Sequence, residues 1–297
     1  MIVFPNWTQL IFLGFFSFIL VKATDITIRA LNRLSRTFKI GAFGLTAFLL
    51  ALATSLPELF VSLVSAVEGT QNMALGVILG SNIANVSLVI GGAALIGGSM
   101  AVVGDFLRRD IFYSFLAATL PLLLLLDKTL SRVDGLILLT VYLAFNFIVL
   151  RGKPHVAELS EQGALVRRFF RRMNQGAAEK QFGWLFFGVA LLLFSADMIV
   201  RAASHLAGTF GLPNLFIGLV FVAIGTTLPE LFFEIEAIRQ HRISMVLGNL
   251  LGSLVVNSTL ILGVTVLIRP IELDGGFRSY LLATVAFLVI FNLFWFS

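Results

Sequence analysis

Cysteine is absent from this chain of 297 residues, which excludes disulfide bonds and thiolate metal sites. Charged residues are also scarce: Asp, Glu, Lys and Arg make up only 12% of the positions, against roughly 25% in soluble proteins. The chain is 58% hydrophobic, so it has too few charged side chains to cover an ordinary water-exposed surface. This composition is typical of a polytopic membrane protein.

The sequence also lacks the residue patterns that usually carry enzymatic chemistry. We find no nucleophile–base set, no cysteine nucleophile and no phosphate-binding glycine loop, so the sequence predicts neither an enzyme nor a cofactor. The net charge of +5 includes a group of four arginines in one central segment: Arg167, Arg168, Arg171 and Arg172. In a membrane protein such a group indicates a cytoplasmic loop, so no nucleic-acid partner is expected.

Long apolar stretches predict an all-α protein that crosses the membrane nine times. At about 20 apolar residues per span, the helices are expected near residues 8–32, 40–67, 72–98, 110–126, 133–150, 182–207, 212–238, 243–268 and 277–296. We expect a first repeat of five helices at 1–150, a cytoplasmic basic loop at 151–181, and a second repeat of four helices at 182–297. The second repeat has no counterpart of the helix 133–150, so a tenth helix is missing.

The short loops differ in their content of Lys and Arg, which predicts the orientation of the protein. With the N-terminus outside, the inner side receives the central arginines and most other basic residues: Arg33, Arg36, Lys39, Arg108, Arg109, Arg239 and Arg242. The outer side keeps four: Lys128, Arg132, Arg269 and Arg278. We therefore expect an inner-membrane protein with its N-terminus outside and its central loop in the cytoplasm.

Two short motifs each occur twice in the chain, and in both cases the second copy follows the first by 172 positions without a gap. The segment Ala-Thr-Ser-Leu-Pro-Glu-Leu-Phe at 53–60 matches Gly-Thr-Thr-Leu-Pro-Glu-Leu-Phe at 225–232. The segment Gly-Ser-Asn-Ile-Ala-Asn at 80–85 matches Gly-Ser-Leu-Val-Val-Asn at 252–257. Because five spans form the first half, the second copy enters the membrane upside down. This is the inverted-repeat arrangement of secondary transporters.

Each copy places a proline inside an apolar helix. Pro57 has no N–H and its ring crowds the carbonyl group of Ala53, so we expect the helix to open there. Pro229 is expected to open its helix near Gly225 in the same way. Carbonyl groups freed in hydrocarbon must be satisfied by protein, water or an ion, so midplane breaks of this kind indicate an ion site.

Glu58 and Glu230 stand beside the two breaks. A carboxylate at the bilayer centre costs on the order of 3 kcal/mol even on the lenient insertion scale, and no Lys or Arg lies at matching depth in these spans. Hard cations such as Ca²⁺ and Na⁺ prefer carboxylate, carbonyl and hydroxyl oxygens. The sequence therefore predicts an ion site that combines the two acids with four neighbouring hydroxyl groups: Thr54, Ser55, Thr226 and Thr227.

The glycine-rich segments add a second doubled pattern. Gly76, Gly80, Gly248 and Gly252 repeat at a spacing of four, which lets helix backbones approach closely. A serine and an asparagine four residues apart share one helix face in each copy. Helix–helix contact is the usual role of such residues, but their duplication beside the broken helices favours the ion site for Ser81, Asn85, Ser253 and Asn257.

Other charged residues in the spans are given structural roles. Asp25 and Arg29, like Asp197 and Arg201, are four apart on a helix and are expected to neutralise each other near helix ends. Glu234 lies near the inner end of its span and is expected to be exposed at the membrane interface. We therefore expect Glu58 and Glu230 alone to carry the charge of the ion site.

These doubled motifs, Thr-Ser/Thr-Leu-Pro-Glu followed by Gly-Ser-x-x-x-Asn, resemble those of the sodium/calcium exchanger family within the calcium/cation antiporter superfamily. The likeness extends over nearly the whole chain, to residue 296. It implies a ten-helix fold of two inverted halves with broken helices at the midplane. It also implies ions bound at the centre of the membrane and helices 8–32 and 182–207 that slide across the rest to switch access.

The resemblance implies a particular set of ligands. Glu58 and Glu230 are the principal ones, completed by the side chains named above and by four carbonyl groups: those of Ala51, Thr54, Ala223 and Thr226. Family members often have Asp where this chain has Asn257, so the pocket here has two formal negative charges rather than three.

The sequence thus predicts a secondary antiporter in the lipid bilayer that exchanges Ca²⁺ for Na⁺. Two carboxylates in one cavity of low dielectric must be neutralised, so the competing cations have to replace each other. Three alternatives stay open at this point. One is a Ca²⁺/H⁺ exchanger of the same fold, in which the two acids titrate. The others are a cation channel and a membrane scaffold that transports nothing.

Overall fold

The computed structural model describes residues 6–38, 52, 54–89, 91, 105–151, 176–239, 243–273 and 277–296. The elements of the first half are α1 (Asn6–Phe38), α3 (Leu56–Val67), α4 (Gln71–Ala84), η1 (Asn85–Val89), α6 (Asp105–Leu124), η2 (Leu125–Asp127), β1 (Thr129–Leu130) and α7 (Arg132–Arg151). Those of the second half are α9 (Gly176–Phe210), α10 (Asn214–Ile217), η4 (Gly218–Val222), α11 (Ala223–Arg239), α12 (Ile243–Val255), η5 (Val256–Ile261), α13 (Leu262–Ile268), β2 (Ile271–Glu272) and α14 (Phe277–Phe296).

The all-helical membrane fold with broken helices is confirmed. Each of the nine expected spans contains a helix, although residues 40–51 of the second span and 92–98 of the third lie outside the described residues. Within the described ranges, the helical stretches long and apolar enough to cross a membrane are Thr8–Ala30, Gln181–Phe210 and Val246–Ile268. The only strands described there, β1 and β2, form a two-residue antiparallel ribbon in which Thr129 pairs with Glu272.

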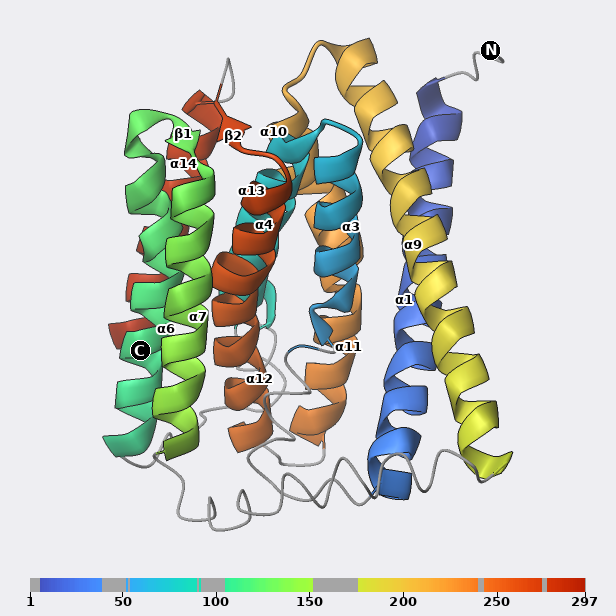
Figure 1. The fold of residues 1–297 in the computed structure, drawn as a ribbon. Helices are drawn as coiled ribbons and strands as arrows, with labels where there is room; N and C mark the ends of the chain where they lie inside the picture. Colours follow the sequence, from blue (N-terminus) through green and yellow to red (C-terminus); the bar gives the residue numbers. More distant parts are fainter. Residues whose placement is uncertain are drawn as a thin grey trace.

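The two halves run in opposite directions through the bundle (Figure 1). In that view α1 descends from the N-terminus, whereas α9, which corresponds to it in the second half, ascends. The second pair of equivalent helices is also antiparallel: α3 ascends, and its counterpart α11 descends. This is the antiparallel relation that an odd number of spans in the first half requires.

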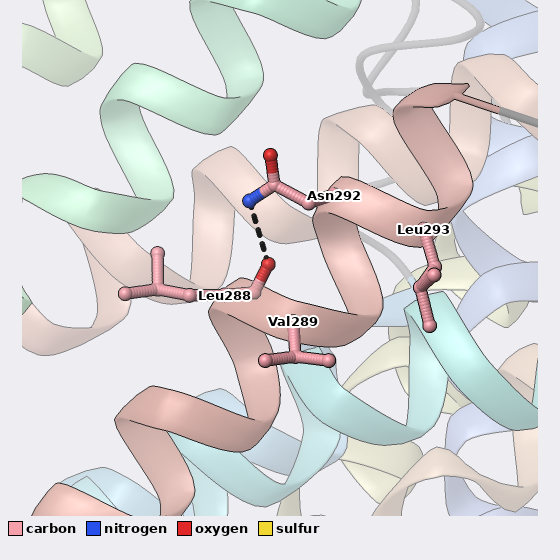
Figure 2. A pocket seen from close by; sticks show the side chains of 4 residues that line it. All are labelled: Leu288, Val289, Asn292 and Leu293. Atoms are coloured by element: carbon pink, nitrogen blue, oxygen red, sulfur yellow. Dashed lines mark hydrogen bonds between the residues drawn. The ribbon is translucent and has the colours of Figure 1, made fainter.

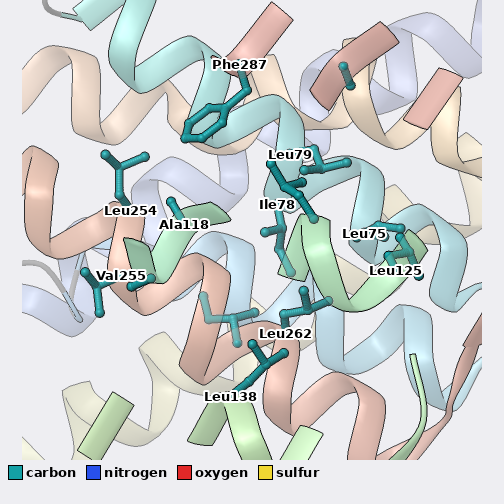
Figure 3. Close-up of a cluster of buried hydrophobic side chains, with 14 of the residues drawn as sticks. Leu75, Ile78, Leu79, Ala118, Leu125, Leu138, Leu254, Val255, Leu262 and Phe287 are labelled. Carbon is teal, nitrogen blue, oxygen red and sulfur yellow. The ribbon is translucent and has the colours of Figure 1, made fainter. Parts of the chain in front are cut away.

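Two apolar clusters hold the bundle together. One joins α4, α6, α7, α12, α13 and α14 through aliphatic side chains such as Leu75, Leu138 and Leu262 (Figure 3). The other joins α1 and α9 to α3, α4 and η4 through residues such as Leu20 and Leu192. The helices α1 and α9 therefore form an antiparallel pair that rests on the rest of the bundle mainly through apolar side chains.

The two expected ion pairs are confirmed, but they lie within the long helices α1 and α9 and not at their ends. Arg29 contacts Asp25 at 3.2 Å, and Arg201 contacts Asp197 at 2.9 Å. Arg201 also contacts Glu68 at 2.9 Å, which the sequence did not indicate. Glu68 directly follows α3, so this exposed contact ties α9 to the end of α3. Exposed pairs of this kind contribute little to stability, because water screens both charges.

The two prolines act differently. In the first repeat the helix is interrupted at Ser55 and begins again at Leu56, with Pro57 in its first turn, which confirms the expected break. In the second repeat α11 continues through Pro229, and the expectation of an open helix at Gly225 was wrong. The irregularity lies earlier, in η4, a short π-helical turn (π-turn) directly before α11. Such a wider turn can realign the backbone hydrogen bonds without ending the helix.

The central connection is shorter than expected. Residues 152–175 lie outside the described residues, but Gly176–Gln181, which we assigned to the loop, already belong to α9. That segment contains Ala, Glu, Lys and Gln, all good helix formers. The assignment of the chain to repeats at 1–150 and 182–297 otherwise stays a prediction.

Candidate ion-binding site

Both doubled glutamates lie inside the bundle. Glu58 is in the first turn of α3, directly after the interruption at Ser55, and Glu230 is within α11. The exposed fraction of both residues is 0%. The positions follow from the apolar pattern, because each acid interrupts a face that packs against other helices.

A serine of the same repeat contacts each acid. Ser81 on α4 donates its hydroxyl to Oε1 of Glu58 at 3.2 Å. Ser253 on α12 donates to Oε1 of Glu230 at 2.8 Å. The two contacts are equivalent under the 172-residue repeat, so the structure brings the Pro-Glu and Gly-Ser motifs together in both halves.

Hydroxyl groups also cross from one repeat to the other. Ser55 donates to Oε1 of Glu230 at 3.4 Å, and the hydroxyl groups of Ser81 and Thr226 lie 3.4 Å apart. The carboxyl groups of Glu58 and Glu230 are close enough to act on each other electrostatically. The two acids therefore belong to one cluster, as the inverted repeats predict.

Neither acid is neutralised by a basic side chain of the described residues, where the ion pairs involve the partly exposed acids Asp25, Glu68 and Asp197. The Oε2 atoms of Glu58 and Glu230 have no hydrogen-bond partner there. Buried polar atoms in folded proteins nearly always have a partner, and a buried carboxylate without one is strongly disfavoured. Two unpartnered carboxylate oxygens in one buried cluster are the chemistry that accepts a cation.

The two doubled asparagines have different neighbours. Asn85 lies beside the Glu230 carboxyl group. Asn257 instead donates to Oδ1 of Asn82 at 3.3 Å, and its own Oδ1 has no described partner. Both asparagines lie in π-turns, η1 and η5. Such turns occur frequently at functional sites because they turn side chains and carbonyl groups out of the regular helix pattern.

Other expected ligands are not aimed at the acids. Thr227 donates to the carbonyl groups of Ala223 at 2.7 Å and Ile224 at 3.3 Å, so it lacks the contact that Ser55 makes. The carbonyl of Ala223, which we expected to face an ion, also accepts from Thr226 at 3.1 Å. Ala51 lies outside the described residues.

The position of Glu234 differs from the one predicted from the sequence. It was expected at the membrane interface, but only 1% of it is exposed. Its Oε1 accepts from Asn249 Nδ2 at 3.3 Å, and Asn249 Oδ1 accepts from Thr54 at 3.1 Å. The helical period contained the signal, because Glu234 follows Glu230 by four residues and shares its face.

A second polar contact was also missed. Asn82 donates to the hydroxyl of Ser258 at 2.7 Å, and both residues are buried. Neither is duplicated, since the equivalent positions in the other repeat are Leu254 and Val86. The search for doubled residues therefore passed over this pair.

Two surface pockets of the described residues lie elsewhere. One is apolar and lies on α14, lined by Leu288, Val289, Asn292 and Leu293 (Figure 2). Asn292 donates to the Leu288 carbonyl at 2.8 Å there, so its amide is satisfied within the helix. A second pocket lies around Gly211 and Pro213, between α9 and α10. Neither pocket is lined by the buried acids.

Comparison with known proteins assigns the chain to a family. Residues 8–151 and 180–297 match the sequence profile described as sodium/calcium exchanger protein. The chain belongs to the sodium/calcium exchanger family. The matched residues include both acids and all the doubled motifs around them. Members of this family are membrane exchangers and not enzymes, in agreement with the sequence.

Curated relatives of the chain are similar to it over most of their length. The inner membrane protein YrbG of Escherichia coli K12 is 33% identical over 259 residues, 86% of this chain and 78% of YrbG. The putative antiporter CaxA of Alkalimonas amylolytica is 31% identical, over 92% of this chain and 86% of CaxA. The sodium/calcium exchanger MaX1 of Methanosarcina acetivorans is 27% identical, over 85% and 81%.

Solved structures of exchangers share the fold. A structure of the sodium-calcium exchanger NCX_Mj, soaked with 100 mM Na⁺ and 10 mM Sr²⁺, has a TM-score of 0.60 at 23% identity, covering 96% of this chain and 90% of that one. The H⁺/Ca²⁺ exchanger CAX has a TM-score of 0.68 at 17% identity, covering 98% and 74%. The chain is thus a multi-pass cation antiporter with the fold of these exchangers.

Proposed function

We propose that this protein exchanges Ca²⁺ for Na⁺ across the membrane at the cluster around Glu58 and Glu230. The observation that carries the proposal is the pair of fully buried carboxylates, each with an unpartnered oxygen and without a basic partner among the described residues. Serine hydroxyls from both halves complete an oxygen-rich environment suited to hard cations. The two negative charges of Glu58 and Glu230 balance one Ca²⁺ or two Na⁺.

Exchange follows from the electrostatics of this cluster. In a low dielectric the two carboxylates cannot both stay charged and empty, so one kind of cation leaves only as the other replaces it. With the site empty and charged, the protein would rarely switch access from one side of the membrane to the other. The flow of Ca²⁺ is therefore coupled to the flow of the counter-ion. The same argument allows protons as the counter-ion, because a carboxyl group is also neutralised by protonation. A Ca²⁺/H⁺ exchange is therefore the second candidate, and the fold it shares with CAX gives it a precedent.

Ion flux in proteoliposomes tests the two candidates. We expect an outward Na⁺ gradient at equal pH to drive ⁴⁵Ca²⁺ uptake, and a pH gradient in sodium-free buffer to drive little. Uptake driven by the pH gradient alone would replace Na⁺ by H⁺ in the proposal. Uptake independent of both gradients would indicate a channel, and no uptake under any condition would contradict an exchanger.

The pair formed by α1 and α9 is proposed as the moving part that exposes the cluster to either side. Phe16 and Phe194 stack edge to face with their ring centres 5.8 Å apart, and Gly188 lies against Thr27, so the two helices are closely joined. Their contact with the other helices is mainly apolar and non-directional. We also propose that the N-terminus is outside and the central loop is cytoplasmic, as the distribution of Lys and Arg predicts.

Asn257→Asp tests the role of the second π-turn. The new carboxylate would lie against Asn82 and add a negative charge among the buried polar residues of the bundle, so we expect Ca²⁺ to bind about ten-fold more tightly, a change of about 1.4 kcal/mol. An altered number of Na⁺ ions per Ca²⁺ is the other expected outcome. Calorimetric binding and flux stoichiometry measure both.

The matched control is Asn72→Asp, which adds the same charge at the end of the bundle where Asn72 contacts the Glu272 carbonyl. We expect this control to leave Ca²⁺ affinity and stoichiometry unchanged. Wild-type affinity and stoichiometry in Asn257→Asp as well would show that Asn257 is not near the ions.

A further inference from the structure

Glu234 is a third buried acid that the proposed exchange does not use. It lies on α11 one turn after Glu230, with 1% of its surface exposed. Its Oε2 atom has no hydrogen-bond partner among the described residues, and no described ion pair includes it. Keeping a carboxylate in this position costs free energy, so its presence calls for a cation or a proton.

A line of polar contacts connects Glu234 with Glu230. Thr54 lies beside the Glu230 carboxyl group, and its hydroxyl donates to Oδ1 of Asn249 at 3.1 Å. Asn249 in turn donates Nδ2 to Oε1 of Glu234 at 3.3 Å. All four residues are at most 2% exposed. The line runs along α11 from the central cluster toward the end of the bundle where α11 ends, the lower end in Figure 1.

This arrangement exists in only one half of the chain. Under the 172-residue repeat, Glu234 corresponds to Ser62 and Asn249 to Val77. Ser62 is also fully buried and its hydroxyl has no described partner, so a neutral residue fits the equivalent position. The extra acid and its amide therefore break the symmetry of the two repeats on one side of the cluster.

A purely structural role explains Glu234 poorly. A hydrogen bond between α11 and α12 needs no charge, and a Gln at this position would supply the same acceptor for Asn249. Glu230, on the same helix, is the charged group among the described residues that acts on Glu234, and it is also an acid. Two neighbouring carboxylates repel each other, which favours cation uptake by at least one of them.

We propose that Glu234 is a third cation-binding carboxylate, which with Asn249 and Thr54 takes up one monovalent cation, Na⁺ or H⁺, beside Glu230. This inference rests on the proposed exchange, to which it adds one counter-ion per cycle. The cation binds at the unpartnered Oε2 atom of Glu234, whose carboxylate neutralises it, while Asn249 holds Oε1 through its Nδ2. The site lies between the central acids and one end of the bundle, so it serves the path to that side.

The experiment measures how many counter-ions move per Ca²⁺ in proteoliposomes. The ion gradients at which net ⁴⁵Ca²⁺ flux vanishes give this ratio for the wild type and for Glu234→Gln and Glu234→Ser. The Gln variant keeps the shape and the acceptor for Asn249, and the Ser variant copies position 62. We expect both variants to exchange with a ratio lower by one, whereas Glu272→Gln, at an exposed acid outside the cluster, keeps the wild-type ratio.

Separate arms identify the ion. A lower ratio against a Na⁺ gradient assigns Na⁺ to the site, and a lower ratio against a pH gradient assigns H⁺. An unchanged ratio in both arms would overturn the inference while leaving the exchange itself intact. Absence of exchange in the wild type would instead contradict the proposed function.

A variant of the partner residue provides a second measurement that keeps Glu234 in place. Asn249→Leu removes the amide that contacts Glu234, so we expect at least about a three-fold weaker apparent affinity for the counter-ion with an unchanged coupling ratio. A counter-ion affinity equal to that of the wild type would count against the site. This measurement remains available even where substitution of Glu234 prevents assembly.

Discussion

Glu58→Gln and Glu230→Gln are each expected to lower Ca²⁺ transport at least about 100-fold, which corresponds to about 2.7 kcal/mol. Gln retains the size of Glu and an oxygen that accepts from Ser81 or Ser253. It removes the charge that balances a divalent cation in a low-dielectric cluster. Initial rates of counter-ion-driven ⁴⁵Ca²⁺ uptake at matched protein density measure the loss.

The same two variants are expected to show a distinct pattern of stability. Without ions, the neutral side chain relieves the burial of an unpaired charge, so the unfolding temperature should stay equal to that of the wild type or rise. Ca²⁺ binds the folded protein and should raise the unfolding temperature of the wild type but not of the variants. A fluorescence melting curve with and without Ca²⁺ measures both effects.

Glu68→Gln is the matched control for these variants, because Glu68 is exposed and its ion pair among the described residues is with Arg201 on α9. We expect it to keep Ca²⁺-dependent stabilisation. Transport near the wild-type rate in a central variant would show that the substituted acid is not an ion ligand and would contradict the proposed site.

The central contacts of the cluster were predictable because they are doubled. Glu58 with Ser81 and Glu230 with Ser253 have the same separation along the chain, and a sequence read for repeats finds both pairs at once. The contact from Ser55 to Glu230 required one more step, the inversion of the second half. An odd number of spans supplies that step, so charge, spacing and topology together predicted the cluster of buried acids.

The unpaired parts of the cluster were not predictable by the same reasoning. Glu234 was placed at the interface because it lies near the end of its span, yet Asn249 on α12 covers it. Depth in the membrane can be counted along one helix, but burial depends on which neighbour packs there. The contact between Asn82 and Ser258 likewise depends on the register between helices, which no local pattern specifies.

The different behaviour of the two prolines shows the same limit. Pro57 and Pro229 occur in nearly identical segments, but the first follows an interruption at Ser55 and the second lies within a continuous α11. In each case proline removes one backbone donor. Near each proline the helix can either break or form a π-turn such as η4. Which of the two occurs depends on the neighbouring helices, since only they can satisfy the freed carbonyl groups.

Gly80→Val is expected to prevent the cluster from forming, by moving α4 away from the second half. A Cβ atom at Gly80 would lie 2.2 Å from the Leu219 carbonyl oxygen and 2.5 Å from the Ala223 Cβ. These contacts involve backbone and a short side chain, so neither neighbour can turn away. Ser81, the next residue, would then lose its contact with Glu58.

The expected size of this effect follows from overpacking, which costs about 1–3 kcal/mol and more where backbone must move. We expect a fall of at least about 5 °C in the unfolding temperature and loss of Ca²⁺-dependent stabilisation. Gly14→Val on α1 is the control, because no described atom lies within 4 Å of a Cβ there. If Gly80→Val matched Gly14→Val in both measurements, α4 would not lie against η4 as closely as the structure has it, and the position of Ser81 beside Glu58 would lose its support. The close approach of these helices and the binding of ions are thus tested by one substitution, since both depend on the absence of a side chain at residue 80.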